Sequence, residues 1–286
     1  MKSNSILCLD SRGFHRLHYL DWGDPDAPRV VICVHGLSRN GRDFDTLAQA
    51  LTPDFRVVCP DMAGRGKSDW LAGKNDYSYS QYLADVTALI ARLTAGGERT
   101  FYWVGTSMGG IIGMLLASLP RNPLRRLVVN DVSTVIPKEA LVRIATYVGK
   151  DPRFATYDEL ENWVRTVSAP FGPLTDEQWR HLTRHGAKER ADGTWGMCYD
   201  PDIGLAFQQA PLEDIVLWQH WDAITCPTLL LRGAQSDLLL KDMAVAMTQR
   251  GPKPRLVEFD GIGHAPMLMA DDQIAVVREF LLSGEA

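Results

Sequence analysis

The stretch "FYWVGTSMGG", residues 101–110, places a lone serine among glycines between two apolar runs. It contains G-x-S-x-G as Gly105, Ser107 and Gly109, after the run 100–105 and before "IIGMLLASLP". A serine held in a sharp strand-to-helix turn needs neighbours without side chains, so that strand and helix can approach closely. The helix start also offers free backbone N–H groups to a developing oxyanion. The stretch predicts that Ser107 is a nucleophile, against the plainer alternative of a glycine turn with a solvated serine.

Short apolar runs recur on both sides of this turn. They are rich in β-branched residues and do not alternate with polar ones, as is typical of strands covered on both faces. The runs are "RVVICV" (29–34), "FRVVC" (55–59), "TFYWVG" (100–105), "RRLVVN" (125–130), "PTLLLRG" (227–233) and "RLVEF" (255–259). Segments of helical period lie between them, such as 78–93, where Ser78 and Gln81 have the spacing of a capping box. The alternation predicts an α/β fold with a mostly parallel central sheet and helices on both faces.

Residues 134–221 interrupt this alternation. The segment is punctuated by prolines and contains or ends on five of the eight tryptophans, and it shows no convincing strand. We expect a helical cap (lid) over the edge of the sheet, inserted into a core domain formed by residues 1–133 and 222–286. Trp163, Trp179 and Trp195 of the cap, together with Ser38, are the residues expected to line a substrate pocket.

Two further loops supply partners for the serine. "VICVHGLSRNG" (31–41) follows a strand, and the N–H of Leu37 can join that of Met108 in an oxyanion hole. "FDGIGHAPML" (259–268) places His264 after the last strand, where an imidazole can act as general base.

The acid has two candidates at strand ends. Asp237 follows the strand at 227–233, and an aspartate there can hold the second ring nitrogen of His264. Asp131 follows the strand at 125–130 and stays open as the alternative acid. We favour Asp237.

The order Ser107, Asp237, His264, with the serine turn and the HG loop, resembles the α/β-hydrolase superfamily. The resemblance covers nearly the whole chain, because "PDMAGRGKSD" (60–69) also matches a turn common in these proteins. It implies about eight strands with the cap inserted after the sixth. In its chain order this sequence is similar to serine esterases that carry a cap domain.

This arrangement indicates acyl transfer through an acyl-enzyme. We expect a carboxylesterase-like hydrolase acting on an ester, thioester or lactone of a small apolar substrate. Carbon–carbon bond hydrolases of ring-cleavage products and enol-lactonases share the same triad and stay open, although "HGLSRNG" lacks the G-x-G-P-G-type run associated with the former. A non-catalytic ligand-binding receptor is a remote alternative.

The composition of the chain limits the kinds of molecule that it is expected to bind. The net charge of -5, with both signs interspersed, argues against nucleic acid. The five cysteines include no CxxC pair, so neither a disulfide framework nor a zinc site is indicated, and no metal or cofactor is expected. No apolar run reaches the length of a membrane span, which favours a cytoplasmic protein. The oligomeric state is left open.

Overall fold

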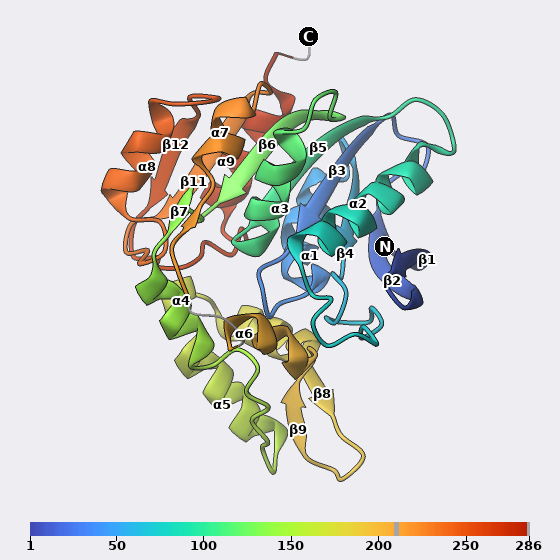
Figure 1. Ribbon diagram of the computed structural model, residues 1–286, viewed down its shortest axis with the longest axis vertical. Helices are drawn as coiled ribbons and strands as arrows, with labels where there is room; N and C mark the ends of the chain where they lie inside the picture. The colour runs from blue at the N-terminus through green and yellow to red at the C-terminus, as the bar shows by residue number, and fades with distance from the viewer. Residues whose placement is uncertain (209–211, 285–286) are drawn as a thin grey trace.

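A central sheet of eight strands organises the molecule, which a computed structural model describes over residues 1–208 and 212–284 (Figure 1). The strands follow the spatial order β1 (Lys2–Asp10), β2 (Gly13–Trp22), β4 (Arg56–Pro60), β3 (Arg29–Val34), β5 (Thr100–Thr106), β6 (Leu124–Asn130), β11 (Thr228–Gly233) and β12 (Arg255–Phe259). The β1–β2 and β2–β4 pairs are antiparallel, and every later pair is parallel. The predicted sheet is confirmed, and each of the six apolar runs forms one of its strands.

Both faces of the sheet are buried, which explains the uninterrupted apolar runs. In β3, Val30, Ile32 and Val34 contribute to one core cluster, whereas Val31 and Cys33 contribute to the other. This division follows from the two-residue period of a strand.

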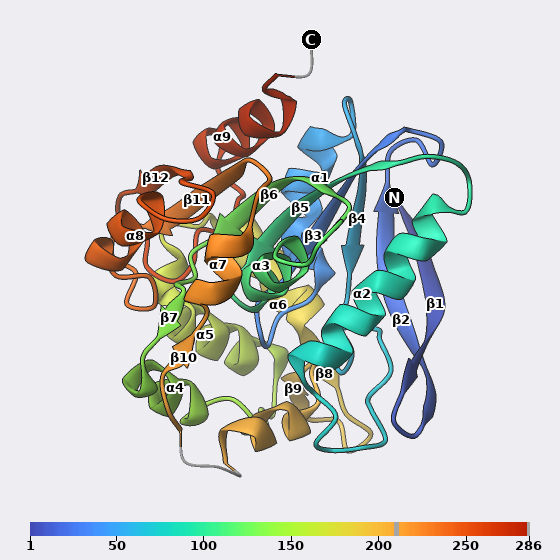
Figure 2. The same ribbon diagram turned by 45° about the horizontal axis from the view of Figure 1, so that its top comes forward.

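Helices cover the two faces in separate groups. They are α1 (Asp45–Leu51), α2 (Tyr79–Thr94), α3 (Met108–Ala117), α7 (Trp218–Ala223), α8 (Lys241–Thr248) and α9 (Asp271–Leu282). Side chains of α2, α3, α7 and α8 belong to one core cluster, and those of α1 and α9 to the other. Figure 2 shows α2, α3 and α7 together in front of the strands.

The start of α2 follows the sequence pattern only in part. The Ser78 side chain accepts a hydrogen bond from the Gln81 N–H at 3.3 Å, as a helix cap does. The Gln81 side chain instead donates to Asp85 at 2.7 Å and to the Leu9 carbonyl at 3.0 Å. The reciprocal half of the capping box is therefore replaced by contacts to β1 and to the next helical turn.

The insertion, residues 134–221, lies between β6 and β11 in the chain, and its residues 138–197 lie below the sheet in the view of Figure 1. Its elements before α7 are β7 (Val135–Ile136), α4 (Lys138–Ala145), α5 (Tyr157–Val167), η2 (Ala169–Phe171), α6 (Asp176–Gly186), β8 (Ala187–Glu189), β9 (Trp195–Met197), η3 (Pro201–Phe207) and β10 (Ile215–Val216). Two antiparallel pairs, β7–β10 and β8–β9, correct the expectation that it holds no strand. Runs of two or three residues are too short to show a period.

The two ends of the insertion are fixed to the rest of the molecule. β7 pairs with β10, so the chain leaves and re-enters the core at one place. Trp221 of α7 is fully buried within the larger core cluster, although the sequence placed it at the end of the cap. Among the described residues, no helix combines the length and the apolar character needed to cross a membrane.

Candidate active site

Ser107 lies at the turn between β5 and α3 and is the N-cap of that helix. Its backbone has φ 54° and ψ -115°, a region that non-glycine residues seldom occupy and that is associated with functional strain. A Cβ atom on Gly109 would collide with the Val34 carbonyl, and one on Gly105 would collide with the carbonyl of Gly109. The two glycines of G-x-S-x-G are therefore required by close backbone packing around the serine.

His264 faces Ser107 from the loop between β12 and α9. Its Nε2 atom lies 3.0 Å from Ser107 Oγ, across 157 residues of sequence. Its Nδ1 atom lies 2.7 Å from Oδ2 of Asp131. The imidazole thus has a hydroxyl on one nitrogen and a carboxylate on the other, which is the geometry of a nucleophile, a base and an orienting acid.

Asp131 follows β6 directly and is completely buried. Besides His264, its carboxylate accepts the Gly233 N–H at 2.9 Å and the Ser236 hydroxyl at 2.7 Å. Its own backbone has a positive φ of 56°, as Ser107 has. Three donors thus hold the carboxylate in place against the histidine.

Asp237 does not occupy the position expected from the sequence. Its side chain is 58% exposed and pairs with Arg143 of α4. The turn after β11 directs the neighbouring Ser236 towards Asp131 and leaves Asp237 on the outside. The alternative acid, Asp131, makes the contact to His264 that we expected of Asp237.

The loop after β3 lies against the nucleophile. A Cβ atom on Gly36 would sit 3.7 Å from the Ser107 Cβ, and Leu37 and Met108 border the same cavity as Ser107. His35 holds this loop, because its Nδ1 donates to the Gly36 carbonyl at 2.7 Å while its Nε2 accepts the Met62 N–H at 3.0 Å. Full burial lowers the pKa of His35 to about 4, so the ring stays neutral.

Arg65 also positions this region, although no sequence pattern indicated such a role. Its side chain is fully buried and donates from Nε to the Leu37 carbonyl at 2.8 Å. One terminal nitrogen reaches the Tyr82 hydroxyl at 2.7 Å, and the other lies 3.6 Å from the sulfur of Met108. The sequence offered only its place inside the turn motif 60–69, which does not distinguish a buried arginine from a solvated one.

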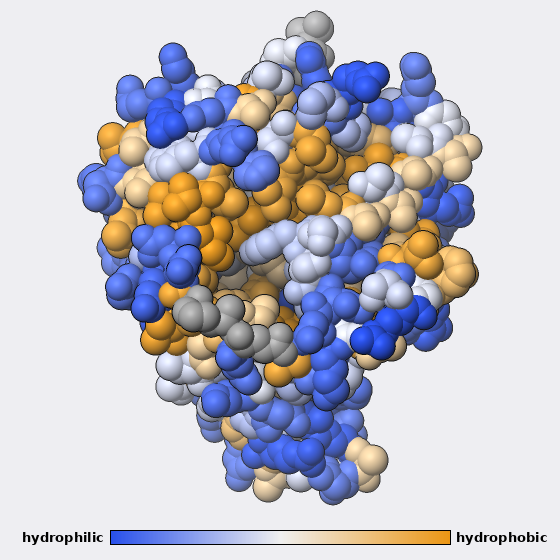
Figure 3. Space-filling model, viewed as in Figure 1, coloured by the Kyte–Doolittle hydropathy of each residue, from blue (hydrophilic) through white to orange (hydrophobic). Residues whose placement is uncertain are grey.

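A cavity of about 420 Å³ opens above the serine. Core residues such as Ile111 and Val132 border it on one side, and Leu141 and Ile144 of α4 border it on the other. Figure 3 shows apolar side chains gathered around a hollow on this face. The volume is within the range of small-molecule sites.

The expected pocket residues divide into two groups. Ser38 and Trp163 border the cavity. Trp179 instead stacks on Phe171 at a centroid distance of 6.4 Å, within a separate cluster, and Trp195 meets Tyr157 edge-on at 5.2 Å. The expectation that Trp179 and Trp195 line the pocket differs from the structure. Trp195 packs within the insertion, and Trp179 packs on Phe171 and joins Met267 and Met269 of the loop after β12 in one cluster.

Comparison with known proteins agrees with this geometry. The family model described as "Alpha/beta hydrolase family" matches residues 31–277, and the chain belongs to this family. The 3-hydroxybutyrate-oligomer hydrolase of Cupriavidus necator is 46% identical over 283 residues, which cover 96% of each chain. Lipase LipV of Mycobacterium tuberculosis is 32% identical, over 93% of this chain and 97% of its own length.

A solved structure extends the likeness to three dimensions. A putative hydrolase from Rickettsia typhi has a TM-score of 0.90 and 31% identity, over 98% of this chain and 99% of that one. Esterases and lipases thus recur among the relatives. The chain is an ester-cleaving serine hydrolase, as the sequence predicted.

Proposed function

We propose that Ser107, His264 and Asp131 form the catalytic triad, with the N–H groups of Leu37 and Met108 as the oxyanion hole. The observation that carries this assignment is the continuous hydrogen-bond chain from Ser107 Oγ through His264 to Asp131. Its position at an apolar cavity supplies a place for the substrate.

The triad accounts for each proton in ester cleavage. Ser107 Oγ bonds to the carbonyl carbon while its proton passes to Nε2 of His264, and the carbonyl oxygen becomes an anion facing the two N–H groups. The carbon–oxygen bond to the alcohol then breaks, and the leaving oxygen takes the proton from His264. Water repeats the sequence on the acyl-enzyme and releases the acid and Ser107.

We propose further that the substrates are short oligomers of a hydroxy acid, of the 3-hydroxybutyrate kind. The relative named for that activity matches almost the full length of both chains. A cavity of about 420 Å³ suits a few ester-linked units of small apolar character. The insertion acts in this proposal as a cap, because α4 and Trp163 border the cavity opposite the serine. A cytoplasmic location stays a prediction.

The substrate is tested with purified protein and Ser107→Ala as the blank. The linear dimer and trimer of 3-hydroxybutyrate are offered beside p-nitrophenyl butyrate, a ring-cleavage diketone and an enol-lactone, and released monomer is counted by mass spectrometry. We expect turnover of the dimer and trimer that Ser107→Ala abolishes. Turnover of p-nitrophenyl butyrate alone would refute the oligomer assignment and leave the triad standing.

A further inference from the structure

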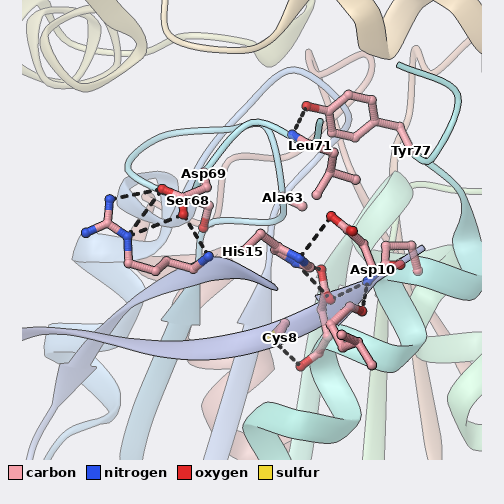
Figure 4. A network of polar contacts seen from close by, with 12 residues as sticks. Cys8, Asp10, His15, Ala63, Ser68, Asp69, Leu71 and Tyr77 are labelled. Carbon is pink, nitrogen blue, oxygen red and sulfur yellow. Dashed lines mark hydrogen bonds and ion pairs between the residues drawn. The ribbon is translucent and has the colours of Figure 1, made fainter. Parts of the chain in front are cut away.

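A second cluster of reactive side chains lies away from the cavity, between the N-terminal hairpin and α2. Cys8 of β1 and His15 of β2 are direct cross-strand partners, and Figure 4 shows both beside Asp10. Asp85 of α2 completes the group, with both carboxylate oxygens 3.1 Å from His15 Nε2. Cys8 and His15 are each 3% exposed, and Asp85 is fully buried.

The three groups have the spacing of metal ligands. One atom from each of Cys8, His15 and Asp85 lies within 4.8 Å of the other two. Tetrahedral zinc, with bonds of about 2.0–2.3 Å, spaces its ligands roughly 3.3–3.8 Å apart. The 3.1 Å between His15 Nε2 and the Asp85 oxygens is slightly shorter than this spacing, so binding needs a small outward shift of these groups as well as an adjustment of the sulfur.

The surroundings also resemble those of a bound metal. A ligating histidine usually directs its second nitrogen to a carboxylate. Nδ1 of His15 is buried without a hydrogen bond, and Asp10 Oδ2 lies 3.5 Å from it. Gln81 donates to Asp85 Oδ1 at 2.7 Å and so orients the carboxylate.

The chemistry of the three donors suits a transition-metal cation. Thiolate, imidazole and carboxylate together are a donor set that suits zinc and cobalt. A hollow bordered by Asp10, Arg12 and Trp70 reaches His15, whereas Cys8 and Asp85 do not line it.

We propose that Cys8, His15 and Asp85 bind one divalent transition-metal cation of the Zn²⁺ class, which ties the β1–β2 hairpin to α2. No sequence motif indicates this site, because successive ligands are 7 and 70 positions apart and Cys8 is not part of a CxxC pair. The site is independent of the esterase reaction and of its substrate.

A second group, Asp45, His181 and His185, also has ligand spacing. Arg42 already pairs with Asp45 there and lies 3.4 Å from His185. A guanidinium in that place opposes a second cation, so this group serves as a control.

Cobalt distinguishes the two groups, because only the first contains sulfur. The protein is produced in medium with Co²⁺ replacing Zn²⁺, so that the ion is present as the chain folds. We expect about one cobalt per chain and a near-ultraviolet thiolate-to-cobalt charge-transfer band. Cys8→Ser should abolish the band, while Cys198→Ser, which removes the most accessible thiol, and His181→Ala should keep it.

Stability gives a second readout. Removing the ion with a chelator should lower the unfolding temperature of the unaltered protein by roughly 5 °C and leave Cys8→Ser unchanged. Asp85→Asn provides a second variant, with circular dichroism and esterase activity reporting on its fold, and it should bind less cobalt. A wild-type protein without the band overturns the proposal, as does a band that survives in Cys8→Ser or disappears in Cys198→Ser.

Discussion

Replacing Asp131 by asparagine should nearly abolish turnover, whereas the same change at Asp237 should not. Asparagine can keep its oxygen on the Gly233 N–H, but its amide nitrogen then faces His264 Nδ1 and Ser236 Oγ, each 2.7 Å from the present Oδ2. The histidine is driven into the tautomer with hydrogen on Nε2. That hydrogen points at Ser107 Oγ, which lies 3.0 Å from Nε2, and the ring cannot accept the serine proton.

The expected loss in kcat is of the order of 10⁴, or about 5 kcal/mol of barrier. Ser236 also loses its acceptor, which should reduce the free energy of unfolding by about 1 kcal/mol. Asp237→Asn removes only an exposed ion pair with Arg143, so kcat should change by less than about threefold.

The assay compares initial rates on p-nitrophenyl butyrate for both variants, divided by the folded fraction from circular dichroism and denaturant unfolding. A kcat for Asp131→Asn above a tenth of the wild-type value would contradict the assignment of Asp131 as the acid. So would a larger loss per folded molecule in Asp237→Asn.

Three further predictions follow from the same geometry. Ser107→Gly and Ser107→Ala should both be inactive. In urea unfolding the glycine variant should be more stable by about 1 kcal/mol, because a φ of 54° strains alanine but not glycine. Equal stability of the two variants would show that the backbone of Ser107 is not strained. Trp163 borders the cavity and Trp195 does not, so Trp163→Ala should change the acyl chain-length preference in ester kinetics, whereas Trp195→Ala should change only the unfolding temperature. The same chain-length preference in both variants would contradict the placement of Trp163 in the pocket. Burial lowers the pKa of His35 from 6.5 to about 4, so between these pH values the unfolded chain binds more protons and the free energy of unfolding falls as the pH falls. Between pH 7 and 4 the free energy of unfolding should therefore fall by about 3 kcal/mol less in His35→Gln than in the wild type. An equal fall in both proteins would contradict the lowered pKa of His35.

The parts of the site that could be predicted are those set by short-range pattern. Ser107 needs glycines at fixed positions, and His264 follows the last strand in a glycine-rich loop, so both lie where the sequence placed them. The strands could be predicted equally well, because a strand that is buried on both faces of its sheet has an uninterrupted apolar sequence.

The choice of acid depended on the path of one turn. Asp131 and Asp237 both follow strands that end at the same edge of the sheet, and adjacent strands β6 and β11 carry them. The turn after β11 determines which carboxylate faces His264. In this turn the Ser236 hydroxyl donates to Asp131 and accepts the N–H groups of Leu238 and Leu239, so Ser236 faces inward and Asp237 faces outward. Propensity and spacing do not encode that contact.

Arg65 and the tryptophans of the insertion show a second limit. Buried arginine and exposed arginine look alike in a sequence, and only the carbonyl of Leu37 and the hydroxyl of Tyr82 reveal the role of Arg65. Trp179 and Trp195 were assigned to the pocket from composition, but pairing with Phe171 and Tyr157 directs them elsewhere. The role of Arg65 and the positions of the two tryptophans both depend on tertiary packing, which composition does not describe.

Covalent labelling shows whether Ser107 is the nucleophile of a serine esterase. The protein is incubated with a fluorophosphonate, and intact mass followed by peptide mapping locates the adduct. We expect one adduct per chain on Ser107, with loss of esterase activity in proportion to labelling and no adduct in Ser107→Ala. An adduct on another residue, or one that persists in Ser107→Ala, would contradict it.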